Sequence, residues 1–401
     1  MNTSQRKPIR TAILCISDVY LSRGLQLQAF YEARGEEVII LTPDFSHRHK
    51  APIAPASRKR GVDYLHHRPY QKNLSWQRLL GHAEFARDAR KYLEAWKPDR
   101  IHALVPANTI AREMDKYKKE HPEVLLYFDL IDLWPESLPV KGFEKTPPAW
   151  IWKHLRNAHL SAANKVFAEC GLFASRIEQQ TGIRPQILYW SIPDDKTDSK
   201  LNLPANRLSL CYLGSVNNII DLEAMQAFLS LLASRMPVDL HVIANGEKKE
   251  EMVEKLSGIV HVIDHGLVYD PQAKQDIFDA CHFGLNLMKP EVVIGLSMKS
   301  LDYLKGGLPI INSLQGDLHD WIDTSKCGIN IDHDDLELAA RQVLESLKEE
   351  NLQMRANARR LYTQTLSIDA FESRLNKILT DRKSTRLNSS HPLSSRMPSS
   401  A

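Results

Sequence analysis

The chain has 401 residues, of which 43% are hydrophobic and 25% are charged. This length accommodates two domains of ordinary size and excludes a single small domain. The composition is typical of a globular protein in water. No apolar run approaches the roughly 18 residues that a membrane-spanning helix needs, and the apolar segment 11–17 is too short for the core of a secretion signal. We therefore expect a cytoplasmic protein.

The first half of the chain alternates short apolar runs with amphipathic stretches, which is the pattern of strands alternating with helices. Because the apolar runs are nearly continuous, they indicate a parallel sheet covered by helices on both faces. We expect one such domain over 1–191. Its predicted strands are 11–17, 37–42, 100–105, 124–131, 166–170 and 187–189, and its predicted helices are 21–34, 76–96, 111–120, 150–163 and 173–181.

A polar, proline-containing stretch over 192–207 interrupts this alternation and is typical of a linker. The alternation then resumes, so we expect a second doubly wound domain over 208–365 and a closing helix over 366–380. The fold class is therefore α/β with two Rossmann-like domains. The predicted strands of the second domain are 208–213, 239–244, 260–264, 283–287, 309–312 and 328–331, and its helices include 222–234, 272–280, 336–348 and 352–363.

The last 21 residues, 381–401, are rich in serine and arginine and lack helical or strand periodicity. We expect a disordered tail that is not part of the fold. The segment resembles a translated sequencing adapter, and a natural disordered tail is the alternative. It carries four basic residues and one acidic residue, and the rest of the chain balances at 48 of each sign. The net charge of +3 therefore gives no support for nucleic-acid binding.

The five cysteines lie in apolar stretches and show no CxxC spacing. This pattern predicts neither a zinc site nor a disulfide framework. We expect them to be small buried residues: Cys15, Cys170, Cys211, Cys281 and Cys327.

The stretch Gly295–Asn312 predicts a short helix followed by a buried strand. Ser297 is placed to cap the helix, and its apolar residues Met298, Leu301 and Leu304 recur every third position on one face. Gly306 or Gly307 suits the left-handed position after the helix. The first turn would present free backbone N–H groups beside Lys299, which together favour a pyrophosphate, and Asp302 lies one turn further on, within reach of a ribose hydroxyl.

This pattern resembles the retaining glycosyltransferases of family 4, which have the GT-B fold of two facing Rossmann-like domains. In that family an acidic residue on such a helix is followed by a Gly-Leu-Pro turn and a strand, and Asp302 matches the second acid of the family's paired-glutamate motif. The position of the first acid holds Ile294, and Glu291 is the carboxylate nearby. The alternative is an ordinary crossover helix with an exposed aspartate and lysine.

The resemblance also assigns donor contacts to loops that follow strands. Gly214 and Ser215 match a phosphate-binding loop, and Asn245 and Gly246 match a turn beside the nucleotide. The family's Arg and Lys after the first loop are replaced here by Asn-Asn-Ile-Ile-Asp, so we expect Lys289 and Lys299 to supply the positive charge. A solvated lysine is the alternative for Lys289. Gly24, after the first strand, takes the place of the paired glycines of many relatives.

In the first domain, the segment Asp129–Glu136 contains DLWPE, which resembles bacterial surface-polysaccharide and capsule transferases of family 4. Asp132 would accept a hydrogen bond from a sugar hydroxyl, and Trp134 would present an apolar face to a sugar ring. The alternative makes Trp134 a core residue and Asp132 a helix cap. His102 matches a histidine that the family often places near the acceptor, and a buried structural histidine is its alternative.

The segment 47–72 holds seven lysines or arginines and four histidines against a single acid, Asp63. Because the first domain handles acceptors in the family, this charge suggests contact with a lipid-linked diphosphate or with an anionic membrane at its inner face. A solvated loop is the plainer alternative.

These observations predict a retaining hexosyl- or N-acetylhexosaminyltransferase that uses a nucleotide diphosphate sugar, with UDP as the expected nucleotide, and a surface-glycan or lipid-linked acceptor. We expect no cofactor and no metal. Lys299 would stabilise the leaving diphosphate, Asp132 would act at the acceptor, and the departing phosphate would take the acceptor proton. The alternatives are a nucleotide-sugar epimerase and a non-catalytic subunit with the same fold.

Overall fold

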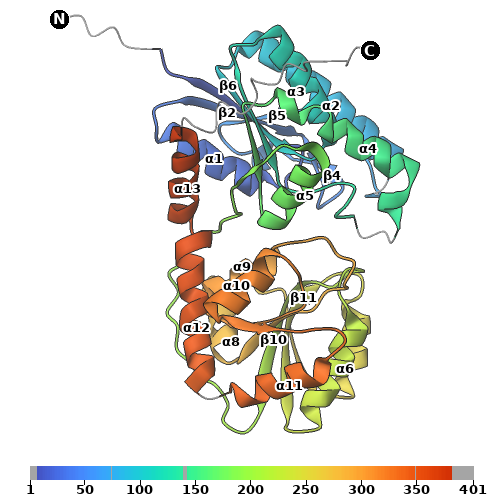
Figure 1. Ribbon diagram of the computed structural model, residues 1–401, viewed down its shortest axis with the longest axis vertical. Coiled ribbons are helices and arrows are strands. Elements are labelled where there is room, and N and C mark those ends of the chain that lie inside the picture. The colour runs from blue at the N-terminus through green and yellow to red at the C-terminus, as the bar shows by residue number, and fades with distance from the viewer. Residues whose placement is uncertain (1–6, 74, 139–141, 348, 382–401) are drawn as a thin grey trace, which may run out of the picture. The chain divides into compact units, whose positions relative to one another are not determined.

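The computed structural model describes residues 7–73, 75–138, 142–347 and 349–381. Parallel strands alternate with helices along this whole length, and they form two sheets (Figure 1). The predicted α/β class is therefore confirmed. The tail, which we expected to be disordered and not native, lies outside the described residues from Arg382 onward.

The first sheet has seven strands in the order β5-β2-β1-β6-β7-β8-β9. Its central strands are apolar and buried along nearly their whole length, as a sheet covered on both faces requires. The strands are β1 (Arg10–Leu14), β2 (Glu37–Pro43), β5 (Val62–Leu65), β6 (Arg100–Val105), β7 (Leu125–Leu130), β8 (Lys165–Ala168) and β9 (Gln186–Ile187), and β3 (Phe45–Ser46) pairs with β4 (Ala51–Pro52) in a separate antiparallel ribbon. The helices are α1 (Leu21–Glu32), α2 (Trp76–Trp96), α3 (Asn108–Glu120), α4 (Pro147–Asn157) and α5 (Gly171–Thr181).

The second sheet has six parallel strands in the order β12-β11-β10-β13-β14-β15. Helices cover both of its faces, with α6 on one side and α8, α9 and α12 on the other (Figure 1). The strands are β10 (Leu208–Ser215), β11 (Val238–Asn245), β12 (His261–Gly266), β13 (Phe283–Asn286), β14 (Ile310–Asn312) and β15 (Gly328–Asn330). The helices are α6 (Leu222–Ala233), α7 (Lys249–Ser257), α8 (Pro271–Asp279), α9 (Met298–Lys305), α10 (Asp317–Ser325), α11 (Leu336–Glu345), α12 (Glu349–Leu361) and α13 (Ile368–Thr380).

The chain divides into two compact units by its internal contacts. The first unit comprises Met1–Asp129, Leu155–Phe167 and Ser373–Ala401, and the second comprises Leu130–His154 and Ala168–Glu372. Within the first unit, Arg34 Nη1 donates a hydrogen bond to Asn376 Oδ1 at 2.8 Å, which ties the end of α13 to α1. The domain boundaries and the linker named from the sequence stay predictions.

Sequence periodicity located most of the elements. The bounds of α2 and β6 are those predicted, and the bounds of most others shift by one to four residues. The predicted helix 150–163 is wrong in its extent, because α4 ends at Asn157 and a separate short turn covers Leu160–Ala162. The strand β5 and the helices α7 and α10 were not predicted. Of the helices that the structure describes, none has the length and apolar character needed to cross a bilayer.

Candidate functional site

The loops that follow β10, β11 and β13 meet at the carboxyl edge of the second sheet. The amide of Val216, just after β10, donates to the carbonyl oxygen of Asn245 at 2.8 Å. The amide of Lys289, after β13, donates to the carbonyl oxygen of Ile219 at 3.0 Å. These bonds bring the predicted donor residues Gly214, Ser215, Asn245, Gly246 and Lys289 to one edge, where parallel α/β sheets bind ligands.

Two glycines shape this edge. Gly214 has φ of +111° and Gly246 has φ of +112°, a backbone region that residues with a side chain rarely enter. A Cβ atom added at Gly246 would lie 2.4 Å from the carbonyl oxygen of Val216 and 2.7 Å from Ser215 Oγ. Glycine is therefore required at Gly246 both by the backbone conformation and by the close approach of the neighbouring loop.

The helix α9 begins after Ser297, at the predicted residue, but the predicted cap is wrong. The backbone of Ser297 is extended, while its hydroxyl contacts Asn286 Oδ1 at 3.2 Å and Ser300 Oγ at 2.7 Å and makes no bond to an amide of the first turn. The first-turn N–H groups of α9 therefore have no side-chain cap. At the other end, Gly307 takes the left-handed conformation with φ of +66°, and Gly306, with φ of −75°, does not.

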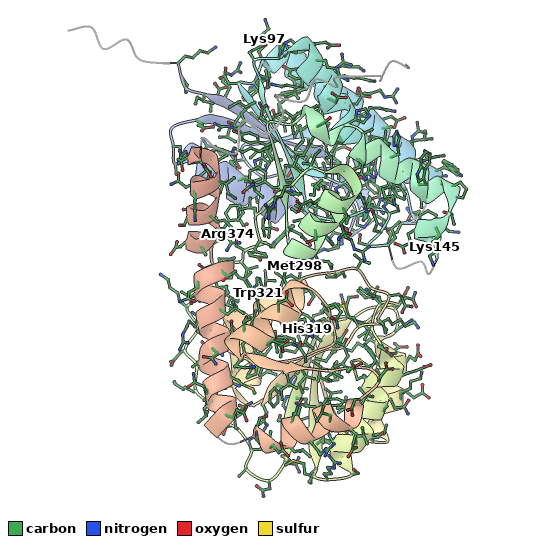
Figure 2. All side chains as sticks on the ribbon, viewed as in Figure 1. Lys97, Lys145, Met298, His319, Trp321 and Arg374 are labelled. Carbon is green, nitrogen blue, oxygen red and sulfur yellow. The ribbon has the colours of Figure 1, made fainter. Side chains whose placement is uncertain are left out.

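Met298 does not share the buried face of α9 that the sequence predicted. Its side chain is half exposed, whereas Leu301 and Leu304 are fully buried. Figure 2 labels Met298 at the start of α9. The one-face prediction is therefore wrong at this residue, although Ser297 and Ser300 beside it are buried. An exposed residue there stays available to a ligand at the sheet edge.

Lys299 has an unusual environment. Its Nζ atom is shielded from solvent and has no hydrogen-bond partner among the described residues, and it lies 4.5 Å from the centre of the Tyr212 ring. Burial lowers the pKa of this lysine to about 7, because desolvation penalises the ammonium form. At pH 7 the amine of Lys299 is thus only partly protonated, and it lies against an aromatic ring on β10.

Asp302 already has a cationic partner. Its Oδ1 lies 2.7 Å from Lys274 Nζ on α8 and 3.8 Å from Lys305 Nζ. The same carboxylate lines a small cavity together with Asp194 and Asp195. A ribose hydroxyl at Asp302 would therefore share the carboxylate with Lys274, and the ribose-binding role stays a prediction.

In the first unit, Gly24 lies inside α1 and not in a loop after β1, so that part of the prediction is wrong. A Cβ atom there would contact Ile13, Cys15 and Ile40 at ordinary distances of 3.7–3.9 Å, which means that Gly24 packs against the sheet. Its assigned contact with the donor is untested. The preceding residue, Arg23, makes a fully buried ion pair with Asp129 at 2.9 Å.

His102 is fully buried in the middle of β6. Its Nδ1 lies 3.0 Å from the Tyr31 hydroxyl, its ring stacks on Phe167, and its Nε2 lies 3.6 Å from Asp129 Oδ2. Burial lowers the pKa of His102 and keeps the ring neutral. These contacts are those of the structural alternative, and a role at the acceptor stays a prediction.

Asp132 organises the turn that contains DLWPE. Its carboxylate accepts hydrogen bonds from the Leu133 amide at 2.8 Å, from Trp134 Nε1 at 2.8 Å and from the Ser137 hydroxyl. Trp134 is only 6% exposed and its ring lies 5.8 Å from that of Trp152. Both residues thus have structural partners, while half-buried Asp132 keeps some exposure for the proposed acceptor contact.

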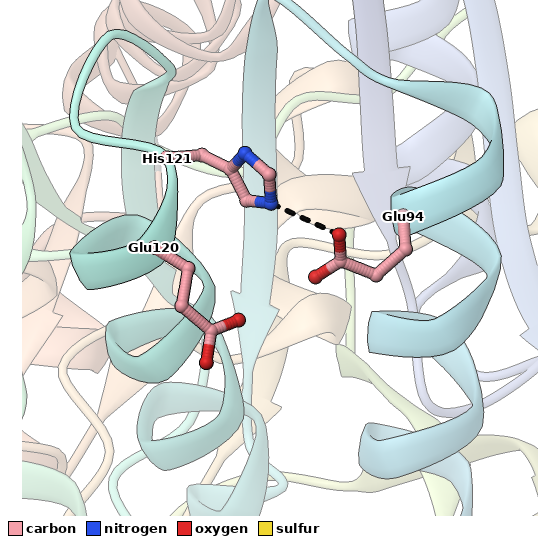
Figure 3. Close-up of side chains that lie close together, drawn as sticks. All are labelled: Glu94, Glu120 and His121. Atoms are coloured by element: carbon pink, nitrogen blue, oxygen red, sulfur yellow. Dashed lines mark hydrogen bonds and ion pairs between the residues drawn. The ribbon is translucent and has the colours of Figure 1, made fainter.

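Among the described residues, one group has the spacing of a metal site: Glu94, Glu120 and His121 (Figure 3). His121 Nε2 contacts Glu94 Oε2 at 2.9 Å, but both oxygens of Glu120 are held by Arg90 Nη2 at 2.6 and 2.7 Å. A cation would have to displace this guanidinium from an exposed carboxylate. The group is better described as a surface network of ion pairs between α2 and α3.

The sequence did not reveal a further cluster of basic side chains in the first unit. Arg78 on α2 joins His47, Lys50 and His67 around the ring of Tyr70, and His82 on α2 contacts the ring of His67. The basic composition of 47–72 was the available signal, and it did not include the residues of α2.

No family model matches the chain, and no curated protein matches it. Many solved structures do. The lipopolysaccharide outer core galactosyltransferase WaaB is 14% identical with a TM-score of 0.66, and the match covers 92% of this chain and 99% of WaaB. The sucrose-phosphate synthase of Thermosynechococcus elongatus is 12% identical with a TM-score of 0.71, over 92% and 98% of the two chains. The chain has the GT-B fold.

The Anabaena protein HepE shares the GT-B fold and was solved with UDP and glucose. It is 12% identical to this chain with a TM-score of 0.63, and the match covers 93% of this chain and 99% of HepE. The predicted GT-B architecture is therefore confirmed over nearly the whole chain. At these identities the likeness establishes the fold, and the chemistry has to be argued from the residues at the edges of the two sheets.

Proposed function

We propose that this GT-B protein transfers a sugar from a nucleotide diphosphate donor, with UDP as the nucleotide, to a hydroxyl group of a surface-glycan or lipid-linked acceptor. The proposal is supported by the likeness over nearly the whole chain to glycosyltransferases, among them a structure with UDP. The observation that carries it is local. The carboxyl edge of the second sheet combines two glycine turns, a first turn of α9 without a side-chain cap, and the amine of Lys299, which has no hydrogen-bond partner among the described residues.

A diphosphate at this edge would meet three kinds of donor. The first-turn amides of α9 offer N–H groups at the positive end of the helix dipole. The turns at Gly214 and Gly246 let backbone approach the phosphate closely. Lys289 and Lys299 replace the charge of the family's missing Arg and Lys, and the half-buried stem of Lys299 allows its amine to leave the Tyr212 ring and reach an anion.

Transfer would proceed with retention at the anomeric carbon. As the glycosidic bond breaks, negative charge grows on the leaving diphosphate, so donors that strengthen with that charge lower the barrier. The departing phosphate oxygen would accept the proton of the attacking hydroxyl, which assigns no general base to the protein. Asp132 would then orient the acceptor, and we expect hexosyl or N-acetylhexosaminyl groups as the sugar and no metal.

We further propose that the first unit contacts an anionic membrane. The segment 47–72 is strongly basic, and Trp76 and Leu80, one turn apart on α2, are 79% and 50% exposed. An exposed tryptophan next to lysines and arginines is suited to the interface of an anionic bilayer. This surface would bring the enzyme to a lipid-linked acceptor.

One assay separates the proposal from its alternatives. The protein is incubated with UDP-glucose, UDP-galactose and UDP-N-acetylglucosamine, with and without a panel of glycan acceptors, and free UDP and sugar isomers are measured. We expect UDP release that depends on an acceptor. Isomerisation of the sugar without an acceptor would identify an epimerase. If neither reaction occurs and UDP does not bind, the proposal is overturned.

A further inference from the structure

A cluster of basic side chains surrounds one tyrosine in the first unit. The ring of Tyr70 is 6% exposed, and Lys50 Nζ lies 4.7 Å and Arg78 Cζ 5.7 Å from its centre. The Tyr70 hydroxyl is hydrogen-bonded to His47 Nδ1. We call this the Tyr70 cluster, and its members are His47, Lys50, His67, Tyr70, Arg78 and His82.

The fold itself assembles the Tyr70 cluster. The strands β1, β2 and β5 are parallel neighbours, so the loops after their carboxyl ends meet at one edge of the first sheet. His47 and Lys50 follow β2, His67 and Tyr70 follow β5, and Arg78 lies in the first turn of α2. The position is equivalent in topology to the donor edge of the second sheet: a strand-end site beside a helix N-terminus.

Lys50 and Arg78 both contact Asn73 in the part of the chain that the structure describes. Lys50 Nζ contacts Asn73 Oδ1 at 2.5 Å and His47 Nδ1 at 3.4 Å. Arg78 Nη1 donates to the carbonyl oxygen of Asn73 at 2.9 Å. Lys50 keeps partial exposure, whereas Arg78 is 9% exposed.

Burial lowers the pKa values of basic groups in the cluster, and these groups also lie close enough to repel one another, which lowers their pKa values further. Burial, followed by repulsion from Arg78 and Lys50, lowers the pKa of His47 to about 4. Burial and then Arg78 also lower the pKa of Lys50 and of His82. Asp18 is the acid that opposes this charge, and its oxygens accept hydrogen bonds from the Ser46 hydroxyl and the His47 amide at 2.5 and 2.9 Å.

Two more acids face the cluster from its rim, and both have partners of their own. Asp44 accepts from the His67 amide at 2.8 Å, and Glu84 pairs with Arg68 at 2.6 Å. The positive charges of Lys50 and Arg78 exceed the negative charge of Asp18, so the centre of the cluster is positive. A phosphate group is attracted to this charge and accepts hydrogen bonds from ammonium and guanidinium groups.

We propose that the Tyr70 cluster binds a phosphate group of the acceptor, through Lys50 and Arg78 with His47 beside them. This inference rests on the proposed function, because it assigns the site to an acceptor while the donor residues stand at the edge of the other sheet. The chemistry is that of a phosphomonoester or a diphosphate. Its source is either a soluble sugar phosphate or the diphosphate head of a lipid-linked sugar.

The test is a calorimetric titration of the full chain with inorganic pyrophosphate in the presence of saturating UDP, which occupies the donor edge. We expect saturable binding that weakens at least tenfold in Lys50→Met, which changes a partly exposed side chain. Lys59→Met removes the same charge from an exposed position of the same basic segment and should leave the affinity unchanged. Arg78→Lys, which keeps the charge but loses the guanidinium, should weaken binding by a smaller factor.

Two competitors distinguish the sources of the phosphate. Glucose 6-phosphate should compete with pyrophosphate only if the site takes a soluble sugar phosphate, and farnesyl diphosphate only if it takes a lipid-linked diphosphate. The inference is overturned if pyrophosphate shows no saturable binding, if UDP abolishes its binding, or if Lys50→Met binds it as tightly as the parent does. Failure of the proposed function would look different: UDP would not bind at all, while pyrophosphate binding would still depend on Lys50.

Discussion

The carboxyl edges of the two sheets have the same topology but present different chemistry. At the second edge, Gly214, Gly246 and the uncapped turn of α9 expose backbone, and Lys299 is the one buried cation there without a hydrogen-bond partner in the described chain. At the first edge, the Tyr70 cluster fills the same topological position with charged and aromatic side chains. If both proposals hold, the two edges of one fold recognise anions in different ways, one through backbone and one through side chains.

This difference has a physical consequence for substitutions. Backbone donors are fixed by φ and ψ, so the second edge depends on glycine conformation and on helix geometry. Side-chain donors carry whole charges, so the first edge depends on individual residues and on their protonation. Changes at the second edge should therefore act on folding and donor binding together, whereas changes at the first edge should act on binding alone.

The largest effect is expected from Gly246→Val, which changes a glycine turn at the second edge. The substitution forces a side chain into φ of +112° and places its Cβ 2.4 Å from the Val216 carbonyl oxygen. We expect the free energy of unfolding to fall by about 2–4 kcal/mol and UDP binding to be lost. Urea denaturation measures the first effect. Gly258→Ala, at an open position with negative φ, is the control and should change stability by less than about 1 kcal/mol.

Lys299→Met tests whether the buried amine is neutral in the empty protein. The pKa of Lys299 is lowered from 10.5 to about 7, so between these values the unfolded chain binds a proton that the folded chain does not. The free energy of unfolding contributed by this group therefore rises with pH from about 7 to about 10. We expect Lys299→Met to abolish that rise and to stabilise the fold at pH 7, as measured by urea denaturation at several pH values.

The matched control for this experiment is Lys289→Met, which removes a lysine from the same edge but from a partly exposed position. It should keep the rise of stability with pH. A Lys299→Met protein that is less stable than the parent at pH 7, or that retains the parent's pH dependence, would contradict the assignment.

Asp302→Asn tests whether this carboxylate at the second edge binds ribose or only Lys274. The ion pair is partly exposed, so its loss should cost less than about 1 kcal/mol of stability. If Asp302 accepts a ribose hydroxyl, UDP affinity should fall about fivefold, as measured by calorimetry. Lys274→Met frees the carboxylate and should not weaken UDP binding; equal losses in the two variants would assign Asp302 to the ion pair alone.

The smallest expected effect concerns the membrane contact of the first unit. Trp76→Ser should reduce co-sedimentation with vesicles of phosphatidylglycerol and phosphatidylcholine about threefold, because one interfacial tryptophan is lost while the basic segment remains. Trp150→Ser on α4 removes another exposed tryptophan, 61% exposed against 79% for Trp76, from the other unit and should have no effect. The contact is ruled out if the parent protein does not bind the vesicles, or if its binding to them does not depend on salt.

Periodicity was sufficient to predict the architecture, because apolar runs and amphipathic spacing depend on neighbours in the sequence. The bounds of α2 and the start of α9 followed from such local signals. The edge strand β5 was missed because it is short, only partly buried and embedded in a basic segment. Its loop, which carries His67 and Tyr70, was therefore not placed next to the loop after β2.

The contacts of the candidate sites were less predictable, because they join residues that are distant in the sequence. The hydroxyl of Ser297 bonds Asn286 rather than the helix, and the amine of Lys299 turns back to Tyr212 on another element. The buried pair of Arg23 with Asp129 spans 106 residues. Spacing alone places such residues on an element, but only packing decides which partner each polar group finds.

The most direct test of the account is the pH dependence of UDP binding to the parent protein and to Lys299→Met, measured by calorimetry between pH 7 and pH 9. Binding at the second edge should require a proton on Lys299, so the parent's affinity should fall about tenfold or more across this interval. The variant should bind more weakly at pH 7 and show a flat profile. No binding of UDP by the parent, or the same pH profile in both proteins, would contradict the account.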